Sequence, residues 1–323
     1  MIKNLWSKTE ADQFKDDLEL RVYTSRLLGQ DATLVLHGGG NTSVKITEVN
    51  IVGEQEEILY VKGSGWDLVS IEKSGFSPVR MTHMIKLSKL KSLSDPQMVN
   101  ELNTQLINSS APTPSVETIL HAILPFKYVD HTHADAVVTI SNTENGKDRI
   151  REIYGNRVVI VPYVMPGFDL SKDVSRLFSE QSTDKTEGMV LLNHGIFSFG
   201  STAKQSYDRM IDLVGLAEKY LISQNAWKIE KSSGNINSKS MRNEVARLRQ
   251  IISTVIGSPV LLNLTNSKRG IDFSNRDDVA DLATRGPVTP DHVIRTKRIP
   301  MIGRDIEQYV EEYISYFNTY EPK

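Results

Sequence analysis

The stretch Asp130-His131-Thr132-His133-Ala134-Asp135 stands at the head of an apolar run, residues 136–140, whose pattern predicts a buried strand. Side chains two residues apart in a strand point to the same side, so His131 and His133 direct two imidazoles toward one point. Neutral imidazole is a good ligand for zinc and neighbouring transition metals. The pair alone is a weak signal, and two histidines bonded to backbone carbonyls at a strand end remain an alternative.

The composition limits the classes of function. A chain of 323 residues allows one large domain or two ordinary ones, and 39% hydrophobic with 24% charged residues is typical of a soluble protein. A net charge of -2 argues against a nucleic-acid or membrane-surface partner, and no apolar run approaches the roughly 18–20 residues of a membrane span. The polar start does not resemble a secretory signal, so we expect a cytoplasmic protein. Because there is no cysteine, a metal must be held by histidines and carboxylates.

Two glycine-rich turns each follow a short apolar segment. Residues 33–36 predict a strand that runs into His37-Gly38-Gly39-Gly40-Asn41-Thr42-Ser43, and residues 58–61 predict a strand that runs into Lys62-Gly63-Ser64-Gly65. Backbone N–H groups in such turns suit an anion, although a plain turn is an equally good interpretation of each. Neither turn is a Walker A loop, and no G-x-G-x-x-G opens a dinucleotide-binding unit, so we expect no NAD.

Two further segments carry candidate polar residues. Residues 113–124 predict a helix that Thr113 caps, with Glu117 and His121 on one face; an ordinary solvated pair is the alternative. Residues 188–192 predict a strand that presents His194 at its end, where a turn residue is again the alternative. The polar residues 231–240 predict a linker, so we expect a catalytic domain over residues 1–230 and a C-terminal extension of linker and helices over residues 231–323.

Taken together, these motifs resemble the class II aldolase/adducin family over roughly residues 10–230. The matching motifs are Gly40-Asn41-Thr42-Ser43, Ser64-Gly65, Ser115-Val116-Glu117, His131-Thr132-His133-Ala134 and His194-Gly195. The resemblance implies that Asn41, Ser64, Gly65 and Ser115 bind a phosphate, that Glu117 is the catalytic acid/base, and that His131, His133 and His194 hold Zn²⁺ or another divalent metal. Val116 stands where the family has a second serine, which puts one phosphate hydrogen bond in doubt.

A closer likeness is to the N-terminal aldolase part of bifunctional rhamnulose-phosphate aldolase/short-chain dehydrogenase proteins. It rests on His37-Gly38-Gly39-Gly40-Asn41-Thr42-Ser43, Tyr163-Val164-Met165-Pro166-Gly167-Phe168 and Gly286-Pro287-Val288-Thr289-Pro290-Asp291-His292. The implied fold is α/β: a three-layer α/β/α arrangement around a largely antiparallel central sheet, here with a mainly helical C-terminal extension. The family is usually a homotetramer, and a tyrosine from a neighbouring subunit often completes its site; Tyr309, Tyr313 and Tyr316 are candidates.

The implied activity is that of a zinc-dependent lyase. It would cleave or form a C–C bond in a phosphorylated ketose, similar to rhamnulose- or fuculose-1-phosphate, through a metal-stabilised enediolate, with an aldehyde as the second product. Two kinds of alternative remain open. Sugar-phosphate 4-epimerases and 3-oxo-tetronate 4-phosphate decarboxylases share the fold and related chemistry, and adducin-like members are non-catalytic binding modules.

Overall fold

The computed structural model describes residues 1–229, 238–265 and 267–321, which divide into two compact units. The first unit comprises Met1–Ala226 together with Val288–Arg295, and the second comprises Trp227–Pro287 and Thr296–Lys323. Most of the predicted linker, residues 231–237, lies outside the described residues. Residues 288–295, which the sequence placed in the C-terminal extension, pack with the first unit. This short segment becomes important at the functional site.

The first unit is built on a seven-stranded sheet with the order β3-β2-β1-β4-β7-β6-β5. Five of the six neighbouring pairs are antiparallel, whereas β5 and β6 run parallel. The sheet is therefore mixed, and the predicted largely antiparallel sheet is only partly right. Both parallel strands are buried along their whole length, as is usual for parallel pairing. The strands are β1 (Asn41–Val49), β2 (Gln55–Lys62), β3 (Phe76–Arg80), β4 (Tyr128–Thr132), β5 (Val158–Val161), β6 (Gly188–Leu191) and β7 (Gly195–Gly200).

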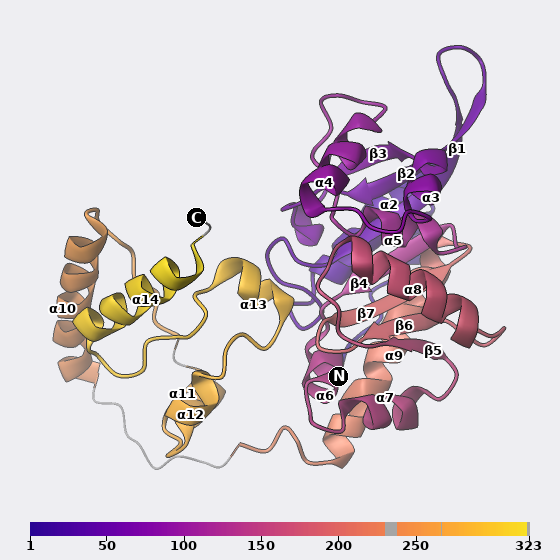
Figure 1. The fold of residues 1–323 in the computed structure, drawn as a ribbon. Coiled ribbons are helices and arrows are strands. Elements are labelled where there is room, and N and C mark those ends of the chain that lie inside the picture. Colours follow the sequence, from indigo (N-terminus) through magenta and orange to yellow (C-terminus); the bar gives the residue numbers. More distant parts are fainter. Residues whose placement is uncertain (230–237, 266, 322–323) are drawn as a thin grey trace. The chain divides into compact units, whose positions relative to one another are not determined.

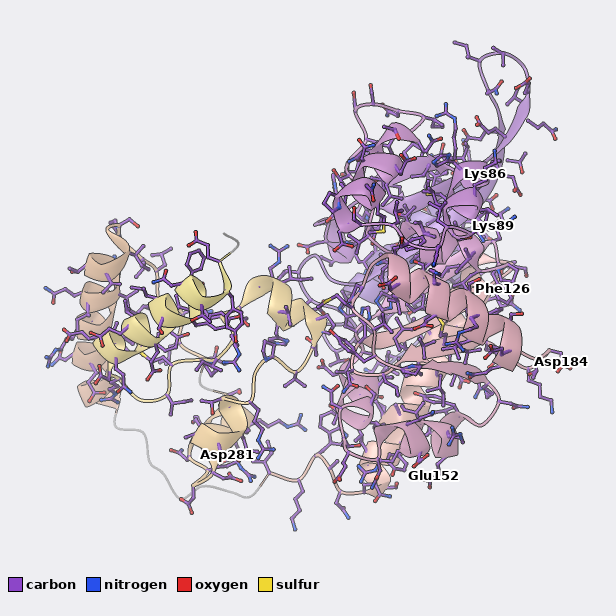
Figure 2. The ribbon with its side chains drawn as sticks, viewed as in Figure 1. Lys86, Lys89, Phe126, Glu152, Asp184 and Asp281 are labelled. Carbon is purple, nitrogen blue, oxygen red and sulfur yellow. The ribbon has the colours of Figure 1, made fainter. Side chains whose placement is uncertain are left out.

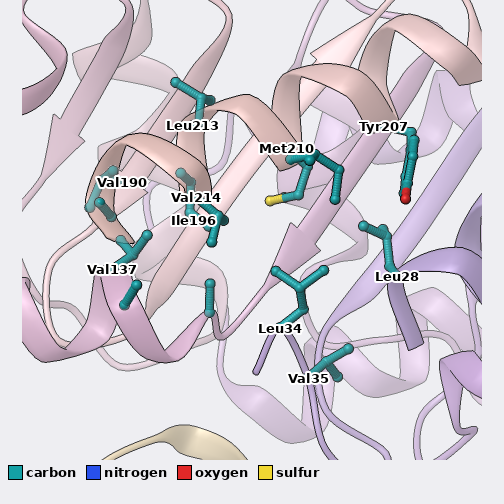
Figure 3. Packing of buried hydrophobic residues seen from close by; sticks show 14 of the residues in the cluster. Leu28, Leu34, Val35, Val137, Val190, Ile196, Tyr207, Met210, Leu213 and Val214 are labelled. Atoms are coloured by element: carbon teal, nitrogen blue, oxygen red, sulfur yellow. The ribbon is translucent and has the colours of Figure 1, made fainter. Parts of the chain in front are cut away.

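Helices pack against both faces of this sheet (Figure 1). One face is covered by α2, α6, α7 and α9, whose apolar side chains form the largest core cluster, seen in Figure 3 around Met210 and Val214. The other face is covered by α3, α4, α5 and α8. The helices of this unit are α1 (Lys8–Ala11), α2 (Asp17–Gly29), α3 (Met81–Leu87), α4 (Asp95–Thr104), α5 (Thr118–Ile123), α6 (Asp135–Ser141), α7 (Gly146–Tyr154), α8 (Phe168–Gln181), α9 (Ala203–Ser223) and α13 (Pro290–Arg295), with short 3-10 turns at Leu68–Ser70 and Lys73–Gly75.

Three of the predicted elements are wrong. Residues 136–140 are not a strand but most of helix α6, because a short apolar run fits a buried helix as well as a strand and here packs against α9. Residues 33–36 are not a strand either, because residues 33 and 34 end a turn and residues 35 and 36 have no regular structure. Helix α5 begins at Thr118 rather than beside Pro114, so Thr113 does not cap it.

The described part of the second unit consists of helices. They are α10 (Ser238–Ile256), α11 (Lys268–Ser274), α12 (Val279–Ala283) and α14 (Ile306–Tyr320). Tyr309 of α14 donates a hydrogen bond to the Ile299 carbonyl at 2.7 Å, while the rings of Tyr313 and Tyr316 contact each other. None of the helices described in either unit combines the length and the apolar character that crossing a bilayer requires.

A buried ion pair ties helix α2 to the central strand. The Arg21 guanidinium and the Asp130 carboxylate are fully buried, and their nearest nitrogen and oxygen atoms are 2.5 Å apart. Most charged side chains of this unit are instead exposed to solvent, as are those labelled in Figure 2: Lys86, Lys89, Glu152 and Asp184. Arg21 also donates to Thr24 at 2.6 Å, and Ser206 of α9 donates to Asp130. Asp130 directly precedes His131, so this network fixes the strand that carries the metal-ligand candidates.

We predict that Arg21→Met lowers the free energy of unfolding by about 3–5 kcal/mol, because it leaves the Asp130 carboxylate buried without its partner charge. Urea unfolding of metal-free protein measures this change. The matched control is Arg151→Ala, which removes an exposed pair with Asp148 and should change stability by less than about 1 kcal/mol. Equal effects of the two variants would contradict a structural role for the buried pair.

Candidate metal centre and active site

Three buried histidines meet at one end of the central strands. His131 lies in β4, His133 is the first residue after β4, and His194 lies in the turn between β6 and β7. Strand β7 pairs with β4 in a register that sets Ile196 opposite Thr132, so the β6–β7 turn lies beside the end of β4. One ligand atom from each histidine lies within 4.8 Å of the others. The structure thus brings the three predicted metal ligands together.

The hydrogen bonds behind two of the rings define which nitrogen faces the centre. His131 Nδ1 lies 3.1 Å from the Ile196 carbonyl oxygen, and His133 Nδ1 lies 2.6 Å from the Asp291 carboxylate. Both oxygens accept, so each Nδ1 carries the proton and each Nε2 presents its lone pair. The two Nε2 atoms nevertheless lie only 3.1 Å apart. Between two neutral rings of this tautomer, such a contact is repulsive unless a cation is bound between the two atoms.

This geometry fits a divalent metal. Two imidazole ligands at about 2.0–2.1 Å from a tetrahedral ion place their nitrogens roughly 3.3 Å apart, close to the spacing observed here. His194 Nδ1 is buried without a hydrogen-bond partner among the described residues. Burial also lowers the pKa of His131 well below its ordinary value and the pKa of His194 to about 4. Both imidazoles are therefore neutral at neutral pH, which is the form that binds a metal.

The Glu117 carboxylate lies directly beside the histidines. Its oxygens are 3.5 Å from His131 Nε2 and 3.8 Å from His194 Nε2, and Oε1 has no hydrogen-bond partner in the described chain. Burial raises the pKa of this carboxyl. The positive charges that His131 and His194 carry when they are protonated at low pH, together with the hydrogen bond from the Asn41 amide, outweigh burial and lower the pKa to about 2. Glu117 is therefore ionised at neutral pH, with one oxygen free to meet a metal or a substrate.

A chain of hydrogen bonds holds Glu117 from behind. Asn41 donates to Glu117 Oε2 at 2.6 Å and to the Ser115 hydroxyl at 3.2 Å. His121 bonds to the Asn41 side-chain oxygen through Nε2 and to the Ser43 hydroxyl through Nδ1 at 2.8 Å. His121 and Glu117 thus do not form a solvated pair, because both are buried and are joined through Asn41. Asn41 and Ser115, both predicted to bind phosphate, thus lie beside the Glu117 carboxylate.

Ser64 and Gly65 lie in the neighbouring turn after β2. The Ser64 N–H donates to the Thr113 carbonyl at 2.8 Å, which sets this turn beside the segment that carries Ser115. Both residues are exposed, and a Cβ added to Gly65 would meet nothing within 4 Å. A Cβ on Gly38 would come within 3.5 Å of the Gly65 carbonyl oxygen, so the two glycine turns adjoin. The four predicted phosphate ligands therefore occupy one neighbourhood.

Two charged residues of the site were missed in the sequence. Lys62 is 2% exposed, its pKa is lowered by burial to about 8, and its Nζ donates to the Gly38 carbonyl at 3.1 Å between the glycine turns. Its position next to the Gly63-Ser64-Gly65 turn was an available signal. Asp291 supports His133 from a segment 158 residues further along the chain, and no local pattern indicated that contact.

Comparison with known proteins agrees with this picture. The family model "Class II Aldolase and Adducin N-terminal domain" matches residues 19–221, and the model "Aldolase class II, second domain" matches residues 239–323. The N-terminal class II aldolase domain of a conserved protein from Thermoplasma acidophilum is 44% identical, with a TM-score of 0.63 over 68% of this chain and 100% of that chain.

Two other relatives are less informative. The Bacillus subtilis protein YuxG, described as an uncharacterized oxidoreductase, is 33% identical to this chain, and the match covers 98% of this chain. The same match covers 49% of YuxG, so this chain spans about half the length of that protein. A sugar-phosphate aldolase from Thermotoga maritima is 16% identical with a TM-score of 0.47, over 65% of this chain and 96% of that chain, and is too distant to support an argument. Because the first family model matches well over half of the sequence, the chain belongs to the class II aldolase and adducin family.

Proposed function

We propose that this protein is a metal-dependent aldehyde-lyase that cleaves or forms a C–C bond in a phosphorylated ketose similar to rhamnulose- or fuculose-1-phosphate. The observation that carries the proposal is the ionised Glu117 carboxylate beside two imidazoles whose lone pairs face each other. The proposal includes Zn²⁺ as the metal and, from the family resemblance, a cytoplasmic homotetramer as the working enzyme.

The residues of the site have complementary roles in this reaction. His131, His133 and His194 would hold a divalent metal, which would act as a Lewis acid toward a carbonyl oxygen of the substrate. In the synthetic direction, ionised Glu117 accepts the proton from the carbon next to that carbonyl. In cleavage the hydroxyl on the neighbouring carbon loses its proton and becomes the aldehyde oxygen as the C–C bond breaks, and the bonding electron pair stays on the carbon next to the carbonyl. Glu117, which is ionised at the start, takes up one proton as the hydroxyl loses its own and delivers one to that carbon, so the protons balance. Asn41 holds the carboxylate in place for both directions.

The two glycine turns are suited to the anionic end of the substrate. Ser64 and Gly65 expose a hydroxyl and backbone groups, and the buried Lys62 ammonium lies between the turns. Binding the phosphate here would orient the reacting carbons toward Glu117. The binding energy of the phosphate, which does not itself react, would thereby lower the barrier of the chemical step.

A panel of phosphorylated ketoses, incubated with metal-loaded protein, tests the reaction class. Release of an aldehyde together with dihydroxyacetone phosphate is the expected result. An epimerised sugar phosphate or carbon dioxide as the product would favour the related 4-epimerase or decarboxylase chemistry instead. A non-catalytic binding role, as in adducin-like members, would give no turnover. Such a role also does not explain why the ionised Glu117 carboxylate is buried beside the histidines.

We predict that the wild-type chain binds about one divalent metal ion, and that His131→Ala abolishes this binding, because fewer than three imidazoles then remain. Elemental analysis after dialysis measures the metal content, and circular dichroism checks that the variant is folded. His83→Ala is the control, since His83 is bonded to Glu101 and lies outside the histidine cluster. Full metal retention by folded His131→Ala would rule out this centre.

We predict that Glu117→Gln keeps its metal but lowers the turnover rate by roughly 10²–10⁴, because the amide cannot accept the proton. Exchange of the α-proton of dihydroxyacetone phosphate with solvent isolates this step and should slow in parallel. Glu101→Gln, which changes a carboxylate bonded to His83, serves as the control and should leave exchange unchanged. Exchange at the wild-type rate in metal-loaded Glu117→Gln would exclude the acid/base role, and loss of the metal would make Glu117 mainly a ligand.

We predict that Ser64→Ala raises KM for the phosphorylated substrate by roughly 10–100-fold, since a hydrogen bond to a charged group contributes about 1.5–3 kcal/mol. KM for the unphosphorylated ketose should stay nearly constant. Ser64 is a sharper probe than Asn41, because Asn41 also holds Glu117. Ser70→Ala, which changes another exposed hydroxyl of the same region, is the control. Equal changes for both substrates would show that this turn does not recognise phosphate.

A further inference from the structure

Asp291 contacts the metal-ligand candidate His133 from a distant part of the sequence. It lies in α13, within the stretch matched by the second-domain family model, yet α13 packs with the first compact unit. The side chain is 2% exposed, one oxygen lies 2.6 Å from His133 Nδ1, and the other accepts the Leu36 N–H at 2.8 Å. Both oxygens are thus engaged in hydrogen bonds.

We propose that Asp291 is a positioning residue of the metal centre, which fixes the tautomer and the ring orientation of His133 and thereby raises the affinity for the metal. The second-domain segment that carries Asp291 is then a working part of the active site. The inference rests on the metal centre of the proposed function, but it does not depend on which reaction the enzyme catalyses.

The His133 ring is less constrained by the backbone than the His131 ring. His133 follows the last residue of β4, so the strand ladder does not fix it as it fixes His131. A neutral imidazole can carry its proton on either nitrogen, and only the Nδ1–H form directs a lone pair from Nε2 toward His131 and His194. A carboxylate behind Nδ1 selects this form and makes Nε2 a stronger donor to a metal. The Leu36 N–H in turn holds the carboxylate at this angle.

The glycine-rich turn leaves room for this contact. A Cβ added to Gly39 would lie 1.5 Å from Asp291 Oδ1 and 2.4 Å from its Cγ, so any larger residue there would displace the carboxylate. Gly39 needs no left-handed backbone conformation, because its φ lies outside the positive range that glycine alone favours. Gly39 therefore lacks a side chain because the Asp291 carboxylate occupies that space while it contacts His133.

Segment 288–295 is also held by bonds that do not involve Asp291. Arg295 donates to the His37 carbonyl at 2.8 Å, and Asn142 donates to the Val288 carbonyl at 3.0 Å. A variant at Arg295 therefore loosens the segment and leaves the carboxylate–imidazole contact in place. This difference separates a positioning role for Asp291 from simple anchoring of α13.

The first test measures metal affinity in the full-length protein by competition with a chelator, using Zn²⁺ and Co²⁺ as probes. Asp291→Ala should weaken binding by about 10–100-fold, the usual effect of losing such a partner of a ligand histidine. Asp291→Asn keeps the shape and one acceptor, so its affinity should fall between those of wild type and Asp291→Ala. Arg295→Ala should stay within about twofold of wild type. An equal loss in Arg295→Ala and Asp291→Ala, or no loss in either Asp291 variant, would overturn the proposal.

The second test needs neither metal nor activity. In metal-free protein at neutral pH, ¹⁵N chemical shifts of the imidazoles report which nitrogen carries the proton. The Nδ1–H form of His133 should dominate in wild type and in Arg295→Ala, and should give way to a mixture in Asp291→Ala. An unchanged tautomer in Asp291→Ala overturns the inference alone, whereas wild type that binds no metal overturns the proposed function as well.

The third test uses Gly39→Ala in a double-mutant cycle. Alone, this change should weaken metal binding about as much as Asp291→Ala, because the new methyl group displaces the carboxylate. Combined with Asp291→Ala, it should add little further loss, since the group with which it collides is gone. Fully additive losses would show that Gly39 and Asp291 act independently, against the proposal.

Discussion

The rest of the site depends on one close contact: His131 Nε2 and His133 Nε2 lie 3.1 Å apart, with their lone pairs facing each other. When both rings are neutral, neither nitrogen can donate to the other, because the single proton of each ring is on Nδ1 and is bonded to an oxygen behind the ring. The fold must therefore hold both rings against their repulsion. It does so with a backbone carbonyl of β7 for His131 and with a carboxylate from α13 for His133. A close approach of the chain around Gly195 completes this arrangement, since a Cβ there would lie 2.4 Å from the Thr132 carbonyl oxygen.

Burial gives this site its electrostatic character. His121, His131 and His194 are at least nine-tenths buried, and burial keeps their pKa values below the ordinary range, so none brings a positive charge to Glu117 at neutral pH. Glu117 is ionised in the same environment, held by Asn41. A buried carboxylate beside neutral imidazoles has a large unmet attraction for a cation.

The candidate metal ligands could be predicted from the sequence more reliably than the secondary structure of the segments that carry them. His131 and His133 do meet, but in the structure the strand ends at Thr132 and the apolar run after them is helix α6, since five apolar residues fit either element. His194 and Glu117 were placed by family motifs, because nothing local distinguishes a turn histidine or a helix-face glutamate from a ligand. Asp291 could not be predicted, because it meets His133 through tertiary packing across 158 residues. The mixed sheet was missed because strand direction is not encoded in the pattern of a short buried strand such as β5.

The three glycines at residues 38–40 show how one motif can serve two physical needs. The sequence pattern suggested an anion loop for the whole run, yet Gly39 faces Asp291 and Gly40 faces the His131 carbonyl, where a Cβ would lie 2.7 Å away. Those two glycines let other parts of the chain approach the metal centre closely. Gly38 alone adjoins the second turn, beside Lys62 and Gly65. The anion site of the proposed enzyme therefore rests on the open turn at Ser64-Gly65 and on the buried lysine, while Gly39 and Gly40 pack against the residues that position the histidine cluster.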